Sequence, residues 1–204
     1  ADEVRLAEIR AARSKRAADY FAANAEHWGK IRSMHIAEDD VEAAMLEMGL
    51  SAHPSSLLDL GTGTGRILQL FAPHVQRGVG VDTSYDMLAV ARSALANDDI
   101  EHMQVRYSDV YKLGQGERFD LIVLHQVLHF LEDPSLALRL AKGRLTRNGR
   151  LLAVDFAPHD FEFLREDHAH RRLGMETSQV KRWMAVAGLK LVEERMLKPS
   201  RDAE

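Results

Sequence analysis

The fold of this 204-residue chain is decided by the stretch Leu57-Leu58-Asp59-Leu60-Gly61-Thr62-Gly63-Thr64-Gly65-Arg66-Ile67-Leu68. An apolar run holding one carboxylate is followed by three glycines at alternate positions and then by renewed apolar spacing. This pattern is typical of a buried strand that turns sharply into a helix. Glycine tolerates positive φ and lets a ligand approach the backbone, and a helix start directs free N–H groups at that ligand. The stretch therefore predicts a ligand site at the turn.

The spacing of the glycines separates two kinds of ligand. A dinucleotide fingerprint, G-x-G-x-x-G, needs its third glycine at position 66, where this chain has Arg66. The pattern D-x-G-x-G-x-G over residues 59–65 instead resembles the first motif of the class I S-adenosylmethionine-dependent methyltransferases. In that family the turn passes close to the methionine part of the cofactor. The resemblance implies cofactor contacts for Asp59, Gly61, Thr62, Gly63 and Gly65.

Composition limits the class of protein further. The length and the 46% share of hydrophobic residues suffice for one α/β domain with a full core. The formal net charge of −4 gives no electrostatic footprint of a nucleic-acid binder, and no apolar run has membrane-spanning length. Without a secretory signal pattern, we expect a soluble cytoplasmic protein with no membrane partner. The absence of cysteine excludes disulfides, thiolate catalysis and thiolate metal sites, and with them arsenic methylation and soft-metal sensing.

A short apolar segment ending in an acid, residues 78–82, predicts the second strand. A carboxylate at the carboxyl end of that strand can accept hydrogen bonds from two adjacent ribose hydroxyls, which is the role we expect for Asp82. Thr83 and Ser84 are placed to cap the next helix, which carries Met87. The resemblance adds Thr83 and Met87 to the cofactor site. The alternative for Asp82 is a helix-capping acid without a ligand.

The third strand is expected over residues 104–107 and leads into Asp109 and Val110. This arrangement resembles the family's third motif. The resemblance implies that Asp109 accepts a hydrogen bond from the adenine amino group and that the backbone N–H of Val110 reaches a ring nitrogen. The alternative is that Asp109 only forms a turn.

A strongly apolar fourth strand over residues 119–124 is followed by two histidines, His125 and His129. The segment resembles the family region that passes the methionine end of the cofactor, which places His125 in the cofactor site. If the segment is helical, the two imidazoles share one face. Three roles stay open for them: half of a metal site, a general base at His129, or a cofactor-contacting or structural role. Without a third ligand we expect no metal.

The remaining segments complete a doubly wound sheet. Helices are predicted over 39–48, 67–71, 135–144 and 178–187, with a polar helical segment over 160–172. A fifth strand is predicted over 150–156, after a turn at Asn148-Gly149, and a sixth over 189–197. The predicted fold is α/β: a Rossmann-like, doubly wound, mostly parallel sheet of the class I methyltransferase type with an N-terminal helical lid. The family's seventh, antiparallel strand is expected to be missing, because residues 198–204 are short and polar.

Residues 1–50 are interpreted as an N-terminal helical linker and lid, and residues 51–204 as the S-adenosylmethionine-binding domain. Residues 2–24 carry the apolar stripe of an amphipathic helix, which packs on the domain or on a partner subunit, so a homodimer through this helix is one expectation. The next segment resembles the aromatic lid of small-molecule methyltransferases. It adds Trp28 to the cofactor site and Tyr20, beside His129, to the catalytic candidates; simple packing of the aromatic residues is the alternative.

A narrower resemblance begins at residue 1 and is to the methyltransferase half of bacterial proteins that fuse an ArsR-type winged-helix repressor to this fold. Two functions then compete. One is transfer of the methyl group of S-adenosylmethionine to an O, N or C nucleophile of a small molecule, with S-adenosylhomocysteine as product. The other is sensing of either compound, without turnover, by a domain that moves an attached DNA-binding domain. This chain would reach DNA only through that missing domain.

Overall fold

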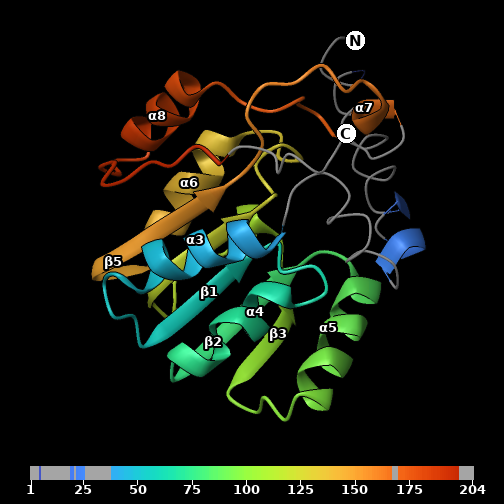
Figure 1. The fold of residues 1–204 in the computed structure, drawn as a ribbon, viewed down its shortest axis with the longest axis vertical. Helices are drawn as coiled ribbons and strands as arrows, with labels where there is room; N and C mark the ends of the chain where they lie inside the picture. Colours follow the sequence, from blue (N-terminus) through green and yellow to red (C-terminus); the bar gives the residue numbers. More distant parts are fainter. Residues whose placement is uncertain (1–4, 6–18, 21, 26–37, 167–169, 198–204) are drawn as a thin grey trace.

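The computed structural model of the chain describes residue 5 and residues 19–20, 22–25, 38–166 and 170–197. Within these residues, five parallel strands form one sheet in the order β3-β2-β1-β4-β5 (Figure 1). The strands are β1 (Ser56–Leu60), β2 (Arg77–Asp82), β3 (Met103–Tyr107), β4 (Phe119–His125) and β5 (Leu145–Val154). The chain runs outward in one direction from β1 to β3 and in the other from β4 to β5, so the predicted doubly wound topology is confirmed.

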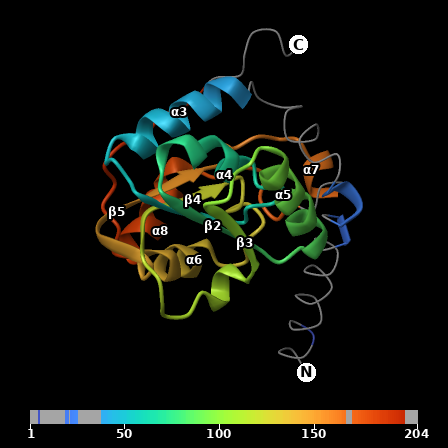
Figure 2. The same ribbon diagram turned by 90° about the horizontal axis from the view of Figure 1, so that it is seen from below.

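Helices cover both faces of the sheet (Figure 2). One face carries α3 (Glu38–Leu50), α4 (Arg66–Phe71) and α5 (Tyr85–Asn97), and the other carries α6 (Pro134–Lys142) and α8 (Thr177–Val186). Three short helical segments lie between these elements: η2 (Ala72–His74), η3 (Val110–Lys112) and α7 (Phe163–Glu166). This three-layer arrangement is the expected α/β fold.

The alternation of side chains along the central strands divides the core into two halves. Leu57 of β1 and Val123 of β4 pack on the face of α3 and α4, whereas their neighbours Leu58 and Leu124 pack on the face of α6. None of these four side chains is more than 2% exposed. Burial on both faces explains why β1 and β4 read as apolar runs in the sequence, with no polar face.

Two helix starts that follow strands are fixed by side-chain caps. The hydroxyl of Ser84 accepts a hydrogen bond of 3.3 Å from the backbone N–H of Met87, so the predicted capping of α5 is confirmed. Asp133 accepts one of 3.0 Å from the backbone N–H of Leu136, and Pro134 occupies the first turn of α6. Such caps satisfy N–H groups that have no partner inside the helix.

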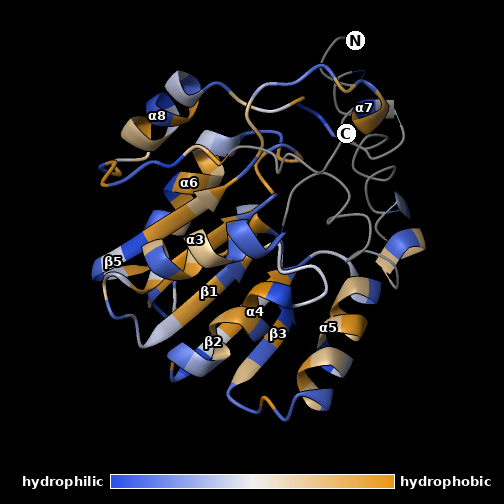
Figure 3. Cartoon of the chain, viewed as in Figure 1, coloured by the Kyte–Doolittle hydropathy of each residue, from blue (hydrophilic) through white to orange (hydrophobic). Residues whose placement is uncertain are grey.

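Strand β5 begins earlier than the sequence predicts. The expected turn at Asn148-Gly149 lies inside the strand as an irregularity, because two steps along β4, from Phe119 to Leu121, correspond to five along β5, from Leu145 to Arg150. This first part of β5 is polar and the remainder is hydrophobic (Figure 3). The turn residues therefore form a local bulge in a paired strand instead of separating two elements.

The sixth strand predicted over residues 189–197 is not formed. Its alternating pattern places Val192 and Met196 at 70% and 64% exposure instead of in a sheet. The polar members of the pattern pair with helices: Arg195 lies 2.6 Å from Glu47 of α3, and Lys181 of α8 lies 2.6 Å from Glu194. The segment crosses between helices as irregular chain, and the part of the chain that the structure describes contains no antiparallel seventh strand either.

Two further predictions concern the segments around the domain. Of the polar helix predicted over 160–172, the described residues form only α7, and residues 160–162 and 170–172 are not helical. Trp28, most of the amphipathic helix over 2–24 and the candidate dimer contact lie outside the described residues. No helix among the described residues is both long and apolar enough to cross a membrane.

Candidate active site

The glycine turn between β1 and α4 has the backbone conformation that its sequence predicts. Gly61, Gly63 and Gly65 have φ of +77°, +53° and +84°. A Cβ atom at Gly61 would lie 2.5 Å from Cγ2 of Val127, which is in the connection after β4, so no larger residue fits there without displacing that connection. The N–H groups of Gly61 and Thr62 donate to the carbonyl oxygen of Val81, at 2.8 and 3.0 Å. These bonds fix the turn against the end of β2.

A cavity, partly open to solvent, lies at the carboxyl ends of β1 to β4. This is the edge of a doubly wound sheet where ligands bind. The lining combines the glycine turn, two acids and an apolar wall. Its residues are Gly61, Thr62, Gly63, Thr64, Ile67, Val81, Asp82, Thr83, Met87, Ser108, Asp109, Val110, His125, Gln126, Val127, Phe130 and Leu131.

Asp82 lies at the end of β2 and lines the cavity as a mostly buried carboxylate. One oxygen accepts a hydrogen bond from the backbone N–H of Gly63 and the other from that of Ser84, each at 2.9 Å. Burial raises the pKa of Asp82, and the hydrogen bonds from Ser84 and Gly63 offset only part of that increase. Each oxygen retains acceptor capacity, so additional donors from a ligand would stabilise the charged form.

Asp109 and Val110, which follow β3, also line the cavity. The Asp109 carboxylate accepts a hydrogen bond of 2.9 Å from the backbone N–H of Tyr111 and caps η3. Asp109 therefore both forms the turn and lines the cavity. Thr83 and Met87 also line the cavity, next to Asp82.

The β4 end of the cavity holds His125 and several residues that the sequence did not single out. Gln126 has φ of +55° and donates its backbone N–H to the carbonyl oxygen of Val154, at 2.7 Å. This sharp turn brings Val127, Phe130 and Leu131 into the apolar wall. A glutamine in the left-handed region of backbone conformation cannot be predicted from the sequence, because tertiary contacts impose this conformation.

Some predicted site residues do not line the cavity. Asp59 lies within β1, 1% exposed, and Gly65 faces α5, where an added Cβ would lie 3.1 Å from the Cβ of Ala91. Gly65 therefore permits close packing of the turn against a helix. Tyr20 is half-buried and is not one of the lining residues; its carbonyl oxygen accepts a hydrogen bond of 2.8 Å from the Asn24 amide.

His129 is placed differently from the helical expectation. Residues 126–130 form a turn, so His125 and His129 do not share a helix face, and His129 is not a lining residue. Its ring is 1% exposed, and its Nδ1 lies 2.7 Å from an oxygen of Asp155. Within the described residues, no group of three histidine, aspartate or glutamate side chains is arranged to hold a metal ion.

A doubly wound sheet with a glycine turn after β1 and acids after β2 and β3 defines the class I methyltransferase fold. Comparison with known proteins agrees: the family described as "Methyltransferase domain" matches residues 53–195, and the chain belongs to this family.

Curated relatives include the uncharacterized methyltransferase YcgJ of Bacillus subtilis, 32% identical over 106 residues, which are 51% of this chain and 42% of the relative. Another is the demethylmenaquinone methyltransferase of Thermotoga maritima, 31% identical over 118 residues, or 56% of this chain and 49% of the relative. The chain thus spans less than half the length of these relatives.

Solved structures show the same fold. The crystal structure of YcgJ superposes with a TM-score of 0.65 and 26% identity, covering 73% of this chain and 68% of that one. A phosphoethanolamine N-methyltransferase 2 of Haemonchus contortus, solved in complex with S-adenosyl-L-methionine, superposes with a TM-score of 0.62 at 18% identity. That match covers 73% of this chain and 36% of the other, and it shows the fold.

Proposed function

We propose that this chain binds S-adenosylmethionine in the cavity and transfers its methyl group to an O, N or C nucleophile of a small molecule. The observation that carries the proposal is Asp82, a half-buried carboxylate in the cavity wall whose backbone donors, from Gly63 and Ser84, do not compensate fully for its desolvation. The two adjacent hydroxyls of a ribose are the donors that such a carboxylate lacks.

The other lining residues fit the remaining parts of the cofactor. Asp109 and Val110 would hold the adenine, and the turn at Gly61 and Gly63 would let the methionine part approach the backbone. Met87, Thr83 and His125 would complete the contacts.

The bound cofactor supplies an electrophilic methyl group on a sulfonium and leaves as the neutral thioether S-adenosylhomocysteine. The protein has to align the acceptor atom with that methyl group and exclude water. Alignment of two reactants contributes about 7–11 kcal/mol in well-oriented systems. The apolar wall of Val127, Phe130 and Leu131 would keep competing water away from the reacting atoms. The similarity to a demethylmenaquinone methyltransferase supports a small-molecule acceptor.

Asp82→Ala tests the cofactor assignment. Isothermal titration with S-adenosylhomocysteine is expected to show an affinity loss of about 1–3 kcal/mol, or roughly 5- to 150-fold, because a charged hydrogen-bond acceptor is lost. Asp86→Ala is the matched control, since Asp86 is exposed in the first turn of α5 and does not line the cavity. An unchanged affinity for Asp82→Ala, or an equal loss in both variants, would contradict the assignment.

Turnover is a separate measurement. Production of S-adenosylhomocysteine from S-adenosylmethionine is followed with panels of hydroxyl, amine and carbon-nucleophile acceptors, and at least one panel is expected to react. Tight binding of S-adenosylhomocysteine combined with no turnover in any panel would contradict an enzyme and favour a sensing domain.

A further inference from the structure

A buried carboxylate–imidazole pair lies beside the cavity. Asp155 follows the last residue of β5, and His129 lies in the turn after β4. His129 Nδ1 is 2.7 Å from Asp155 Oδ1, and the backbone N–H of His129 donates to Oδ2 at 3.3 Å. The backbone N–H of Phe156 donates to Oδ1 at 2.9 Å. The carboxylate is therefore held in place by two strand-end amides while it accepts from the ring.

This contact decides which ring nitrogen carries the proton. A carboxylate only accepts hydrogen bonds, so Nδ1 of His129 is the protonated nitrogen and Nε2 carries a lone pair. Nε2 is fully buried and has no hydrogen-bonding partner within the described residues. A buried acceptor without a partner is uncommon in folded proteins and calls for an explanation, of which a catalytic role is one.

The surroundings of His129 are flat and aromatic. Its ring centroid lies 4.0 Å from that of Phe130 and 5.5 Å from that of Phe156. Phe130 also lines the cofactor cavity, so the imidazole packs against a residue of the cavity wall. The ring of His170 covers His129 at 4.0 Å with a tilt of 30°, and it belongs to an irregular segment next to α8.

We propose that His129, oriented by Asp155, is the general base for an acceptor that carries a phenolic hydroxyl. The proposal rests on the proposed function. The hydroxyl proton passes to Nε2, the oxygen forms its bond to the methyl carbon, and the carbon–sulfur bond breaks with its electron pair remaining on sulfur. The products are the methyl ether, S-adenosylhomocysteine and an imidazolium paired with Asp155, which later releases the proton to solvent.

The choice of a phenol follows from the chemistry of the pair. A neutral amine offers its lone pair without a base, whereas a phenol becomes a strong nucleophile only as its proton leaves. Aromatic walls suit a planar ring. His129 is 1% exposed and the His170 ring packs on it at 4.0 Å, so the proposal requires the His170 ring to move aside when an acceptor binds. Asp155 is a positioning residue, since it acts through His129.

Nitrogen NMR of the imidazole tests the proposal without turnover. In the free protein the His129 resonances are expected to show a protonated Nδ1 and an unprotonated Nε2. In the complex with S-adenosylhomocysteine, phenol, catechol and 1-naphthol should shift the Nε2 resonance by hydrogen bonding to it. Their O-methylated counterparts, anisole, veratrole and 1-methoxynaphthalene, lack the donor and should not. A protonated Nε2 in the free protein, or no difference between the two sets, overturns the proposal.

Variants test the same pair by kinetics. His129→Gln is expected to lower kcat with the phenols by about 100-fold or more and to remove the acidic limb of the pH–rate profile. Asp155→Asn should lower kcat by at least about 10-fold and convert the ring to a mixture of tautomers in the NMR spectrum. The control is His74→Gln, since His74 is exposed in η2. Phenol methylation within threefold of the parent in His129→Gln overturns the proposal.

Calorimetry separates this proposal from the proposed function. His129→Gln and Asp155→Asn should bind S-adenosylhomocysteine within about twofold of the parent, because neither residue lines the cavity. Failure of the parent protein to bind S-adenosylhomocysteine overturns the proposed function and this proposal together. Normal binding with methylation of amines and none of phenols overturns this proposal alone.

Discussion

Two aspartates mark opposite edges of the same sheet and differ in how their charge is satisfied. Asp120 lies near the amino end of β4, and Asp82 lies at the carboxyl end of β2. Burial acts to raise the pKa of Asp120, but hydrogen bonds from Ser56, Ser55 and Thr146 together hold it below its ordinary value. Burial raises the pKa of Asp82, and the hydrogen bonds from backbone amides do not reverse the shift.

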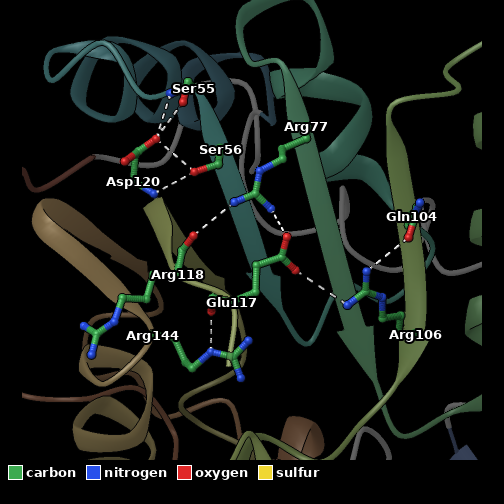
Figure 4. A network of polar contacts seen from close by, with 9 residues as sticks. All are labelled: Ser55, Ser56, Arg77, Gln104, Arg106, Glu117, Arg118, Asp120 and Arg144. Atoms are coloured by element: carbon green, nitrogen blue, oxygen red, sulfur yellow. Dashed lines mark hydrogen bonds and ion pairs between the residues drawn. The ribbon is translucent and has the colours of Figure 1, made fainter. Parts of the chain in front are cut away.

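The amino edge is a closed polar network (Figure 4). One oxygen of Asp120 accepts hydrogen bonds from Ser55 and Ser56, and the other accepts one from Thr146 at 2.9 Å. Nearby, Arg77 pairs with Glu117, and Arg144 donates to backbone carbonyl oxygens. At the amino edge, the polar side chains form hydrogen bonds and ion pairs with one another and with the backbone. At the carboxyl edge, the oxygens of Asp82 can accept further hydrogen bonds from a ligand in the cavity. The difference shows which edge stabilises the fold and which edge is built for a ligand.

Gly61→Ala is the largest expected disruption of the carboxyl edge. The new Cβ would meet Val127 at 2.5 Å, and φ of +77° is strained for any other residue. We expect a loss of about 2–4 kcal/mol in the free energy of unfolding and loss of S-adenosylhomocysteine binding, measured by urea denaturation and calorimetry.

Gly114→Ala is the matched control for this change. Gly114 also has positive φ, +61°, but the nearest atom to its added Cβ is 4.0 Å away. It should cost only the backbone strain, about 1–2 kcal/mol, and leave binding intact. Equal effects of the two variants would show that the contact with Val127 is unimportant.

Asp120→Ala should separate the two edges. It removes the acceptor of three hydroxyls and one backbone amide, so we expect the free energy of unfolding to fall by about 1–3 kcal/mol, with affinity for S-adenosylhomocysteine unchanged. Asp82→Ala should show the reverse: weaker binding with little change in stability. Chemical denaturation and calorimetry on both variants measure this, and a parallel loss of affinity and stability in both would remove the distinction.

The pH dependence of binding gives a smaller effect. Ribose hydroxyls donate to the charged carboxylate, so affinity for S-adenosylhomocysteine is expected to be constant at neutral pH and to fall as pH drops through the raised pKa of Asp82, by at most about tenfold per pH unit. Asp82→Asn should flatten this profile in calorimetric titrations. A parent profile that stays flat down to pH 4 would contradict the role of Asp82.

The sequence predicts the carboxyl edge well, because its signals are local. Three glycines and an acid at the end of a short apolar strand are read from neighbouring residues, and they determine the turn and the position of Asp82. The same local reasoning fails at residues 189–197. Alternating hydrophobicity suggests a strand there, but the segment is irregular chain, and its Arg195 and Glu194 pair with α3 and α8.

The His129–Asp155 pair shows a second limit. The two residues are 26 positions apart, and their contact depends on the left-handed turn at Gln126 and on the pairing of β4 with β5. Neither condition has a local signature, so the sequence identifies His129 as a candidate without its partner. For the same reason, the sequence does not predict that Val127, Phe130 and Leu131 form a wall of the cavity.

Arg66, which occupies the position of the third glycine in a dinucleotide fingerprint, limits how this site can be redesigned. Its guanidinium binds both oxygens of Glu42 in α3, at 2.6 and 2.5 Å, and Glu42 is only 9% exposed. Arg66→Gly would complete the fingerprint but leave Glu42, which is mostly buried, without its cation. Because the Arg66 side chain is 43% exposed, we expect this to destabilise the fold by less than the loss of a fully buried pair. Converting this scaffold to dinucleotide binding therefore requires a neutral residue at position 42 as well, so α3 and the glycine turn must be exchanged as one unit.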